Sequence, residues 1–537
     1  MRRIGWSTAT ASARNGLIEH KVRRRLFAPT INPPDTIPTH KEYALMAFLR
    51  RMSIANFATF LSCGIIVVAN VAATADTEVA DPEAKSRLDT AWTVFQAHLD
   101  EARESLVDPA HFPPVGTDRN LAEGHRNLLG HLGRLIEQEM RLDPLFPEFH
   151  RSMDMLRKHT GENPDAIYLK APIDAKGTYR VRGRVANTSE WRDSKRRLGQ
   201  PKAPRLVTFQ TTTGVPGDTG KLQEMGACTT QTLDFINSFD LKVEADGTFE
   251  LWIAPERPIE AKSKNYLSSR KSMHCRSMAK DIMQEASSLA VREIFSDWQW
   301  EEPMELDIVR IDTQGAPREP IDSEWMAERL ERITLLTRNH IRFWSLLMEF
   351  PLEMRRDANG DGRRSLPVNG INDAEPPFTA GGAAGASQLY ASGVFELKPN
   401  EALIVRVETP TEPHYTGFQL NNMWMEGPDQ QNYVSSLTAH QNPKAADGAR
   451  YYVIAERDPG VPGWVDTTGL RHGFHTMRFV YRENPTAAQL PKLSTQKVPA
   501  DEVRQNLPKA TPTIDDEARR GEVAIRQAHI KKRYRAY

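Results

Sequence analysis

A group of polar and aromatic residues in the last third of the sequence could bind a polar organic molecule. Its members are Tyr415, Asn421, Asn422, Trp424, Glu426, Arg457, Asp458, Trp464, Asp466 and Arg478. Aromatic rings stack on the faces of sugars and other rings, while amide, carboxylate and guanidinium groups fix the orientation of a ligand. If a β-sheet brings these side chains together, they would line a groove for a glycan or an aromatic glycoconjugate.

Part of this group could also catalyse a reaction. Glu426 with Asp458 or Asp466 could supply the acid and the base for hydrolysis or lysis of a glycosidic bond. The binding role would then fall to Tyr415, Asn421, Asn422, Trp424, Arg457, Trp464 and Arg478. A structural interpretation stays open too, because Asp-Pro-Gly and Gly-Trp are turn sequences and tryptophan also fills sandwich cores.

A loop between residues 357 and 365 has the spacing of a calcium site. Its ligands would come from Asp357, Asn359, Asp361, Arg363 (through its carbonyl) and Ser365. Oxygen atoms at positions one, three and five and a glycine at position six are what a hard cation requires. Position twelve, however, is Val368, where such loops carry a glutamate. Calcium binding and an ordinary Asp/Asn/Gly surface loop are therefore both open.

Several common catalytic signatures are missing from the sequence. It contains no G-x-S-x-G, H-E-x-x-H, Walker or strand-linked G-x-G-x-x-G motif and no C-x-x-C pair. These absences disfavour serine hydrolases, zinc proteases, NTPases and dinucleotide-dependent enzymes. The 70 basic residues balance the 70 acidic ones, so no overall field attracts nucleic acid, and we expect no such partner.

An export signal is predicted before Asp76. Arg50 and Arg51 precede an apolar run at 57–69, and Ala73-Thr74-Ala75 follows it, which are the three parts of a cleavable signal peptide. The run has about 13 residues, short of the roughly 20 that span a bilayer. We therefore expect cleavage, no membrane span afterwards, and a periplasmic or extracellular protein.

The signal also bears on the start of translation and on the cysteines. Translation from Met1, Met46 or Met52 is compatible with the sequence, and residues 1–75 form the extension and signal. Cys228 and Cys275 remain after cleavage. In an oxidising compartment they could form a disulfide, but two buried free thiols fit the sequence equally well.

Helices are predicted ahead of the first β-lobe, in the segment 76–160. Leu88, Trp92, Phe95 and Leu99 recur at spacings of three and four residues, the period of an amphipathic helix. This segment would pack on the first β-lobe. In a purely structural role for the protein, it would act as an interaction arm.

The first β-lobe is predicted at 161–320. Apolar residues alternate with arginines from Tyr179 to Val185, the period of a half-buried strand. Asp246-Gly247 predicts the turn of a hairpin. A long helix is predicted from Met273 to Trp298. Strands are expected at 206–212, 241–244, 249–253 and 304–310.

A second long helix, from Ser323 to about Met354, and the Asp/Gly-rich loop fill the segment 321–385. The second β-lobe follows at 386–482, with a hairpin around Pro399-Asn400. Its strands are expected at 395–397, 403–407, 415–424, 451–455 and 474–481. The charged tail at 483–537 is predicted to be mobile.

Short strands with Gly, Pro and Asn turns indicate an α+β, β-rich fold of antiparallel sandwich or jelly-roll lobes.

Four stretches between Asn163 and Tyr481 carry a family resemblance. They are 163–183 (with Asn-Pro-Asp-Ala-Ile-Tyr-Leu and Thr-Tyr-Arg-Val-Arg-Gly), 246–250 (Asp-Gly-Thr-Phe-Glu), 291–298 (Val-Arg-Glu-Ile-Phe-Ser-Asp-Trp) and 458–466 (Asp-Pro-Gly-Val-Pro-Gly-Trp-Val-Asp) with Gly473. Together they resemble bacterial proteins containing the domain of unknown function 1214, which often accompanies the one numbered 1254.

The resemblance is most specific in the last stretch. Gly463 stands there where the family pattern has Asn, and Arg471-His472 replaces a less basic pair. The resemblance implies a sandwich or jelly-roll lobe and, in some members, an exported or envelope setting. It implies no reaction.

Overall fold

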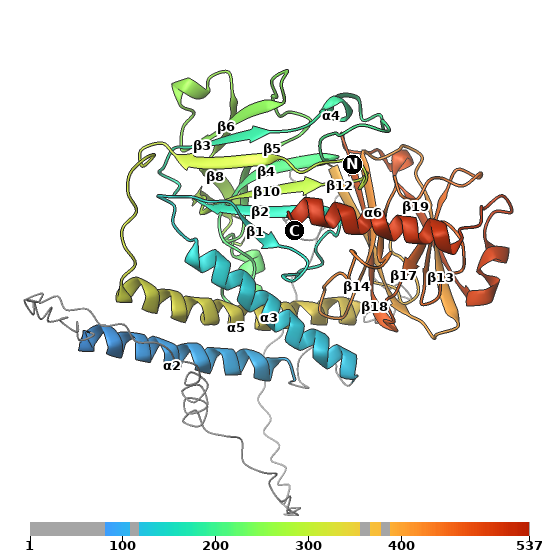
Figure 1. The fold of residues 1–537 in the computed structure, drawn as a ribbon, viewed down its shortest axis with the longest axis horizontal. Coiled ribbons are helices and arrows are strands. Elements are labelled where there is room, and N and C mark those ends of the chain that lie inside the picture. Colours follow the sequence, from blue (N-terminus) through green and yellow to red (C-terminus); the bar gives the residue numbers. More distant parts are fainter. Residues whose placement is uncertain (1–80, 108–116, 276, 355–365, 377–386, 536–537) are drawn as a thin grey trace, which may run out of the picture. The chain divides into compact units, whose positions relative to one another are not determined.

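The computed structural model describes residues 81–107, 117–275, 277–354, 366–376 and 387–535. Within these ranges the protein is α+β and β-rich, as the sequence predicts, with helices preceding two sandwiches of mainly antiparallel strands (Figure 1). The predicted signal peptide and the loop 357–365 lie outside the described residues. No helix in the described part has the length and apolar character needed to cross a bilayer.

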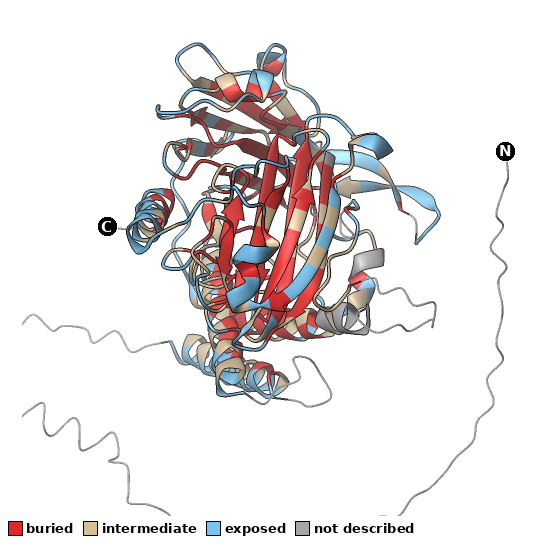
Figure 2. Ribbon diagram, turned by 90° about the vertical axis from the view of Figure 1, so that its right-hand side faces the viewer, coloured by how far each residue is buried: buried red, intermediate tan, exposed pale blue. Residues whose placement is uncertain are grey.

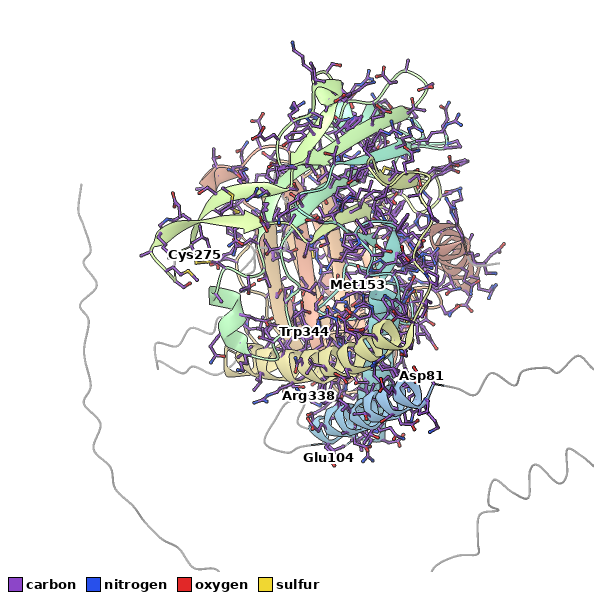
Figure 3. All side chains as sticks on the ribbon, turned by 90° about the vertical axis from the view of Figure 1, so that its left-hand side faces the viewer. Asp81, Glu104, Met153, Cys275, Arg338 and Trp344 are labelled. Carbon is purple, nitrogen blue, oxygen red and sulfur yellow. A yellow bond between two sulfur atoms is a disulfide. The ribbon has the colours of Figure 1, made fainter. Side chains whose placement is uncertain are left out.

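The predicted helical segment and the helix beginning at Ser323 are confirmed. The long helices are α2 (Pro82–Ser105), α3 (Asp118–Met140) and α5 (Ser323–Met354). Asp81 caps α2 by accepting a hydrogen bond from the Glu83 amide, and Thr117 caps α3 in the same way. Helix α2 packs mainly along α5 rather than on a sheet (Figure 3). Arg338 of α5 pairs with Glu101 of α2 at 2.9 Å.

The first lobe is a sandwich of two sheets. One has the order β1-β2-β10-β4-β5 and the other β11-β3-β6-β7. The bounds are β1 His150–Met153, β2 Ala166–Pro172, β3 Tyr179–Arg184, β4 Leu206–Thr212, β5 Thr232–Asn237, β6 Thr248–Ala254, β7 Asn265–Ser268, β10 Ser288–Ile294 and β11 Glu305–Arg310. The predicted alternation in β3 is confirmed: Tyr179 and Val181 are buried in the core with Phe209, while Arg182 and Arg184 face outward.

The second lobe is also a sandwich, with sheet orders β12-β18-β14-β15 and β17-β16-β13-β19. The bounds are β12 Ser387–Glu396, β13 Glu401–Glu408, β14 Tyr415–Asn421, β15 Ser436–Thr438, β16 Arg450–Ala455, β17 Trp464–Asp466, β18 His472–Tyr481 and β19 Lys492–Pro499. Phe395, Val405, Phe418 and Tyr452 meet in its core. Figure 2 shows the buried residues gathered on these strands and the exposed ones on loops and outer helix faces.

The helix predicted from Met273 to Trp298 is wrong. This segment forms the hairpin β8 (Arg270–Cys275) and β9 (Lys280–Glu285) and then the central strand β10. A strand buried on both faces gives a continuous apolar run, which periodicity cannot distinguish from a buried helix. The β-branched residues Ile282, Val291 and Ile294 were the signal that favoured strands.

Both predicted hairpins are also wrong. Residues 241–244 form no strand, although Gly247 has the expected positive φ of 85°, and β6 pairs with β3 and β7. Around Pro399-Asn400 the chain crosses from one sheet to the other, since β12 pairs with β18 while β13 pairs with β16 and β19. Residues adjacent in sequence thus face the same core from opposite sheets.

The tail that we predicted to be mobile has a defined structure. It adds β19 to the second lobe and ends in α6 (Asp516–Tyr534), which lies across both lobes (Figure 1). Two of its arginines are buried: Arg526 is 1% exposed and Arg533 is 2% exposed. The short helices of the chain are α4 Ser189–Asp193, η1 Leu222–Gly226, η2 Ile259–Ala261, η3 Ala487–Gln489 and η4 Ala500–Asn506.

The structure resolves the alternatives for the cysteines, because Cys228 and Cys275 form a disulfide with Cα atoms 5.8 Å apart. The bond ties β8 to the loop before β5 and closes a loop with a sequence separation of 47. Cys275 is labelled in Figure 3.

Reducing this disulfide is expected to lower the free energy of unfolding by about 4 kcal/mol, because the unfolded chain regains loop entropy. Chemical denaturation with and without dithiothreitol measures the difference. The double variant Cys228→Ser, Cys275→Ser serves as the control, since its unfolding should not respond to the reductant. An equal midpoint for wild type in both conditions contradicts the prediction.

Candidate functional site

The structure divides the predicted binding residues between two places. Tyr415, Asn421, Asn422, Trp424, Glu426 and Arg478 lie in a buried polar region where the second lobe meets the first lobe and α3. Arg457, Asp458, Trp464 and Asp466 lie at the end of the other sheet, and Asp458 and Trp464 face α6. We call the first group, with its first-lobe partners Lys158, Glu162, Asn163 and Asp165, the inter-lobe network.

Tyr415 joins the two lobes within this network. Its hydroxyl donates a hydrogen bond to the carboxylate of Asp165 and accepts one from Asn163 Nδ2 at 3.0 Å. Trp298 Nε1 donates to the other oxygen of Asp165 at 3.2 Å. Burial raises the pKa of both the Asp165 carboxyl and the Tyr415 phenol. Since Tyr415 is fully buried, its ring is a core group and cannot stack on a ligand.

Arg478 makes a second link between the lobes. Its guanidinium donates to the carbonyl of Gly161 at 2.6 Å and to the side chain of Gln419. Gln419 in turn donates to Asn421 at 2.8 Å. These contacts give the buried Arg478 guanidinium and the Gln419 amide protein partners, as buried polar groups require.

Glu426 connects the second lobe to α3. Its carboxylate accepts hydrogen bonds from Arg126 at 2.8 Å and from Asn127 at 3.2 Å. Burial, more than any neighbouring charge, raises the pKa of Glu426 to about 7. Close by, Asn422 Oδ1 accepts from the amides of Trp424 and Glu426. Glu426 is completely buried, so it cannot meet a substrate from solvent.

Trp424 is also a packing residue. Its ring lies against Gly124 of α3, where a Cβ atom would approach Trp424 Cζ2 to 2.4 Å. Its Nε1 donates to the carbonyl of Asn120 at 2.9 Å. Only glycine at position 124 leaves room for this ring.

The predicted acid/base pairs are not assembled. Asp458 is exposed and accepts from Arg519 of α6 at 2.8 Å, while Asp466 accepts from the Thr468 amide. In the described part of the chain, no hydrogen bond or ion pair joins Glu426 to either carboxylate. Arg519 also lies over the Trp464 ring at 5.0 Å, and Arg457 is exposed. The structural interpretation of these residues therefore fits their geometry best.

A polar hollow opens instead beside α6, where the two lobes meet. We call it the α6 pocket; it has a volume of about 220 Å³ and is lined by Asp297, Trp298, Gln299, Leu437, His440, Gln441, Glu522, Ile525 and Arg526. Three separate segments supply these side chains: the turn after β10, the segment at the end of β15, and α6.

Asp297 and His440 are the reactive groups of this pocket. Asp297 Oδ2 lies 2.9 Å from Lys202 Nζ and 3.6 Å from His440 Nε2. Asp297 Oδ1 accepts from the Gln299 and Trp300 amides, which fixes the carboxylate. Burial lowers the pKa of His440 against the opposing effect of Asp297, so the imidazole is neutral near pH 7.

Arg526 forms one wall of the α6 pocket. Its guanidinium donates to the carbonyls of Gln430 and Ser436 and lies over the Trp298 ring at 5.0 Å. Burial lowers the pKa of Arg526 to about 10, which leaves it charged at neutral pH.

This pocket was not predicted from the sequence, because the charged composition of residues 483–537 indicated a mobile tail. Arg519, Arg526 and Arg533 recur every seven residues, so they share one face of the helix. That spacing was the signal that could have identified a packed helix.

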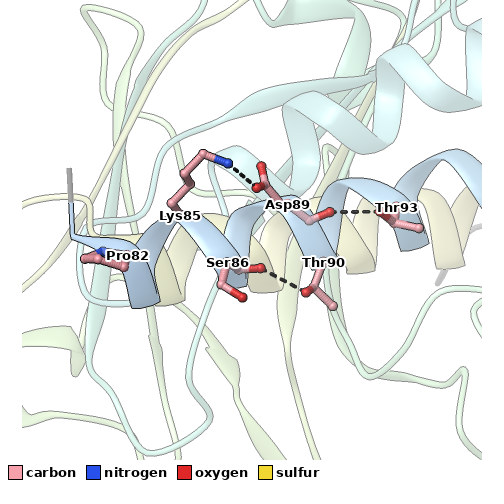
Figure 4. A pocket seen from close by; sticks show the side chains of 6 residues that line it. All are labelled: Pro82, Lys85, Ser86, Asp89, Thr90 and Thr93. Carbon is pink, nitrogen blue, oxygen red and sulfur yellow. Dashed lines mark hydrogen bonds and ion pairs between the residues drawn. The ribbon is translucent and has the colours of Figure 1, made fainter. Parts of the chain in front are cut away.

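A larger hollow, of about 410 Å³, lies on α2 (Figure 4). All of its lining residues come from this single helix: Pro82, Lys85, Ser86, Asp89, Thr90 and Thr93. Lys85 pairs with Asp89 there at 2.5 Å, and both side chains are exposed. An open helix face without a buried polar group cannot enclose a ligand, so its volume does not make it the better site.

Metal binding finds no support in the described ranges, where no three His, Cys, Asp or Glu side chains are placed to hold an ion. The predicted calcium ligands Asp357, Asn359, Asp361, Arg363 and Ser365 lie outside the described residues.

Comparisons with known proteins concern the fold alone. No protein-family model matches the chain, and no curated protein matches it. A solved structure of an uncharacterized protein from Burkholderia cenocepacia shares 23% identity at a TM-score of 0.61, covering 78% of this chain and 99% of its own. The VPA0106 protein from Vibrio parahaemolyticus shares 11% identity over 74% and 100% of the chains, and its TM-score of 0.36 is too low to compare folds.

Proposed function

We propose that the protein is exported and binds a small polyhydroxylated ligand, such as one sugar unit of a glycan, in the α6 pocket. The observation that carries the proposal is the convergence of polar side chains from three chain segments on one hollow between the lobes. Small-molecule sites typically combine an apolar wall with a few convergent polar groups, and they favour boundaries between domains.

The lining of the α6 pocket fits a neutral polyol better than an apolar compound. His440, Gln299 and Gln441 offer hydrogen-bond donors and acceptors, and Glu522 offers acceptors. Leu437 and Ile525 supply apolar contact. The volume of about 220 Å³ lies below the usual range for drug-sized ligands, which limits the bound part to about one ring.

Ligand binding is expected to depend on His440 and Gln299, two lining residues whose side chains make no hydrogen bond with the part of the chain that the structure describes. His440→Leu and Gln299→Ala should each weaken the affinity about tenfold, the effect of one lost hydrogen bond with its partner left unpaired. A thermal-shift screen of monosaccharides, followed by calorimetry on the best one, measures this.

His472→Leu is the matched control, because His472 is exposed at the start of β18 and does not line the pocket. Its affinity should equal that of wild type. The proposal fails if no monosaccharide raises the unfolding temperature, or if the two pocket variants bind as tightly as the control.

The Cys228–Cys275 disulfide supports the export part of the proposal, since such bonds persist mainly in oxidising compartments. Fractionating cells that produce the full chain tests it. Cleaved protein starting near Asp76 in the periplasm or medium is expected, whereas intact protein in the cytosol would reject export.

A second candidate function is that of an envelope hydrolase or lyase. The α6 pocket contains two carboxylates, Asp297 and Glu522, and the neutral His440, whose Nε2 lies 3.6 Å from Asp297 Oδ2, is a candidate general base. Release of nitrophenol from nitrophenyl glycosides, lost in His440→Gln, would favour this function. Binding without turnover would contradict the hydrolase or lyase function and leave ligand binding as the only proposed function.

The relationship to proteins with the domain of unknown function 1214 stays a proposal as well. It rests on the four sequence stretches, of which 291–298 contains two residues of the α6 pocket, Asp297 and Trp298.

A further inference from the structure

The outward side of α3 carries an apolar stripe that no part of the described chain covers. Its members are Leu121, Leu129, Leu132, Ile136 and Met140. Leu129 is 62% exposed and Ile136 is 42% exposed. In Figure 1 the helix crosses in front of α5 at the surface of the molecule. Successive members are three, four or eight residues apart, which places them on one face of the helix.

The apolar surface continues beyond the helix. Leu145 follows the end of α3 and is 47% exposed, and Leu156 is 60% exposed. The Leu156 carbonyl lies 3.0 Å from the position of a Cβ atom on Gly130, which places Leu156 beside the middle of α3. Contiguous exposed patches of this size mark interaction surfaces in soluble proteins.

We infer that this surface, the α3 stripe together with Leu145 and Leu156, binds a second copy of the same chain about a two-fold axis. The stripe is self-complementary when two copies of α3 run antiparallel and cross near residues 130 and 131. In that register Leu121 meets the partner's Met140, and Leu129 meets the partner's Leu132. His125 then meets the partner's Ile136, and every contact occurs twice, as two-fold symmetry demands.

The geometry of the stripe suits this packing. Leu121, His125 and Leu129 form one row with a spacing of four residues, and Leu132, Ile136 and Met140 form a second. Rows with this spacing are ridges that pack against three-residue ridges, such as Leu129 and Leu132, at a crossing angle of about 20°, which keeps the ends of the two helices in contact. Gly133 continues the first row one turn beyond Leu129 and has open space where a Cβ atom would be, so a leucine of the partner can enter there.

Charge and area also favour a second copy. Asp118 lies in the first turn of α3 and Arg141 caps its end, so the antiparallel arrangement brings opposite charges and opposite helix dipoles together. Between Leu121 and Met140 the stripe itself contains no Asp, Glu, Lys or Arg. The exposed apolar side chains offer about 500 Å² per copy, and two copies reach the roughly 1,000 Å² of a specific interface.

Sedimentation of the full chain over roughly 1 to 100 micromolar tests the inference. Wild type is expected to move from the monomer mass to twice that mass as the concentration rises. Leu129→Glu and Ile136→Glu should each keep the protein monomeric at least tenfold beyond the wild-type transition. Both side chains are exposed, so the thermal unfolding of monomeric protein should not change.

Ile259→Glu is the matched control, because Ile259 is 83% exposed but lies in the first lobe, away from α3. It should dimerise like wild type. The pair His125→Cys, Ile136→Cys should give a covalent dimer on oxidation, whereas His125→Cys, Met140→Cys should not.

Three results would overturn the inference. One is a wild type that stays monomeric at every concentration, and another is Leu129→Glu dimerising like the control. The third is a monomeric wild type that binds vesicles of phosphatidylglycerol through Leu129, which would assign the surface to a membrane instead.

Discussion

Arg526→Ala is expected to lower the free energy of unfolding by about 4 kcal/mol, one of the largest effects of any single substitution in this chain. The guanidinium is 1% exposed and donates to the carbonyls of Gln430 and Ser436 in the second lobe. It also covers the ring of Trp298 in the first lobe. Alanine would leave two buried carbonyls unpaired and a cavity beside the α6 pocket.

Chemical denaturation monitored by tryptophan fluorescence measures the change in stability. Arg520→Ala is the matched control, since Arg520 lies on the exposed side of the same helix and should change the free energy of unfolding by less than about 0.5 kcal/mol. Arg526→Lys should recover only part of the loss, because an ammonium group cannot both stack on the ring and reach two carbonyls. Equal stability of Arg526→Ala and Arg520→Ala would show that α6 does not hold the lobes together.

Acid is expected to unfold the protein near pH 5, where most globular proteins are still folded. Burial lowers the pKa of His150 and His414 to about 3 and that of His475 to about 4. Burial also lowers the pKa of His131, His159 and His529 well below the usual value of a histidine. The unfolded chain takes up these protons below pH 6.5, but the folded chain does not. The stabilising contribution of each histidine is therefore complete above pH 6.5 and is lost as the pH falls.

The size of this effect follows from linkage. Each of the three histidines whose pKa is about 3 or 4 should cost about 2 kcal/mol at pH 5, so these three alone remove about 6 kcal/mol, a large part of the usual 5–15 kcal/mol of total stability. Carboxyl groups act in the opposite direction: burial raises the pKa of Glu293 and Glu301 to about 8. Their contribution is complete below pH 4.5 and decreases as the pH rises to 8. Stability should thus be greatest between about pH 6 and 7.

Thermal unfolding measured from pH 4.5 to 8.5 tests the acid prediction. His475→Leu removes one buried titrating group, so the stability lost between pH 7 and 5 should shrink by about 2 kcal/mol relative to wild type. His472→Leu lies three residues earlier on the same strand, is exposed, and should leave the pH profile unchanged. Equal profiles for wild type and His475→Leu would falsify the assignment of acid lability to buried histidines.

Sequence periodicity correctly predicted individual helices and strands that have one buried side and one exposed side. The spacing of Leu88, Trp92, Phe95 and Leu99 predicted α2, and the alternation from Tyr179 predicted β3, because each pattern records which side of one element is buried. The choice of partner strands could not be predicted in this way. The route of β13 to β16 and β19, rather than to its neighbour β12, depends on contacts with residues far along the chain.

The candidate site was harder to predict for a related reason. Tyr415 and Arg478 do meet in space, as the sequence analysis supposed, but their partners Asp165 and Gly161 come from the other lobe and close the space between them. The α6 pocket depends on arginines that composition assigns to the surface. A sequence pattern does not distinguish a solvated arginine from one that stacks on a tryptophan and donates to carbonyls.

Helix α6 follows both sandwiches along the chain, and this order matters while the protein is being made. A growing polypeptide completes the strands of each lobe before the segment that covers Phe295 and Trp298 has left the ribosome. Until then these rings are exposed to water, and they form an apolar surface to which chaperones and other nascent chains can bind. A chain that ends at residue 510 should therefore keep its lobes joined through Tyr415 and Arg478 but expose Phe295 and Trp298, and it should bind a hydrophobic dye more strongly than the full chain.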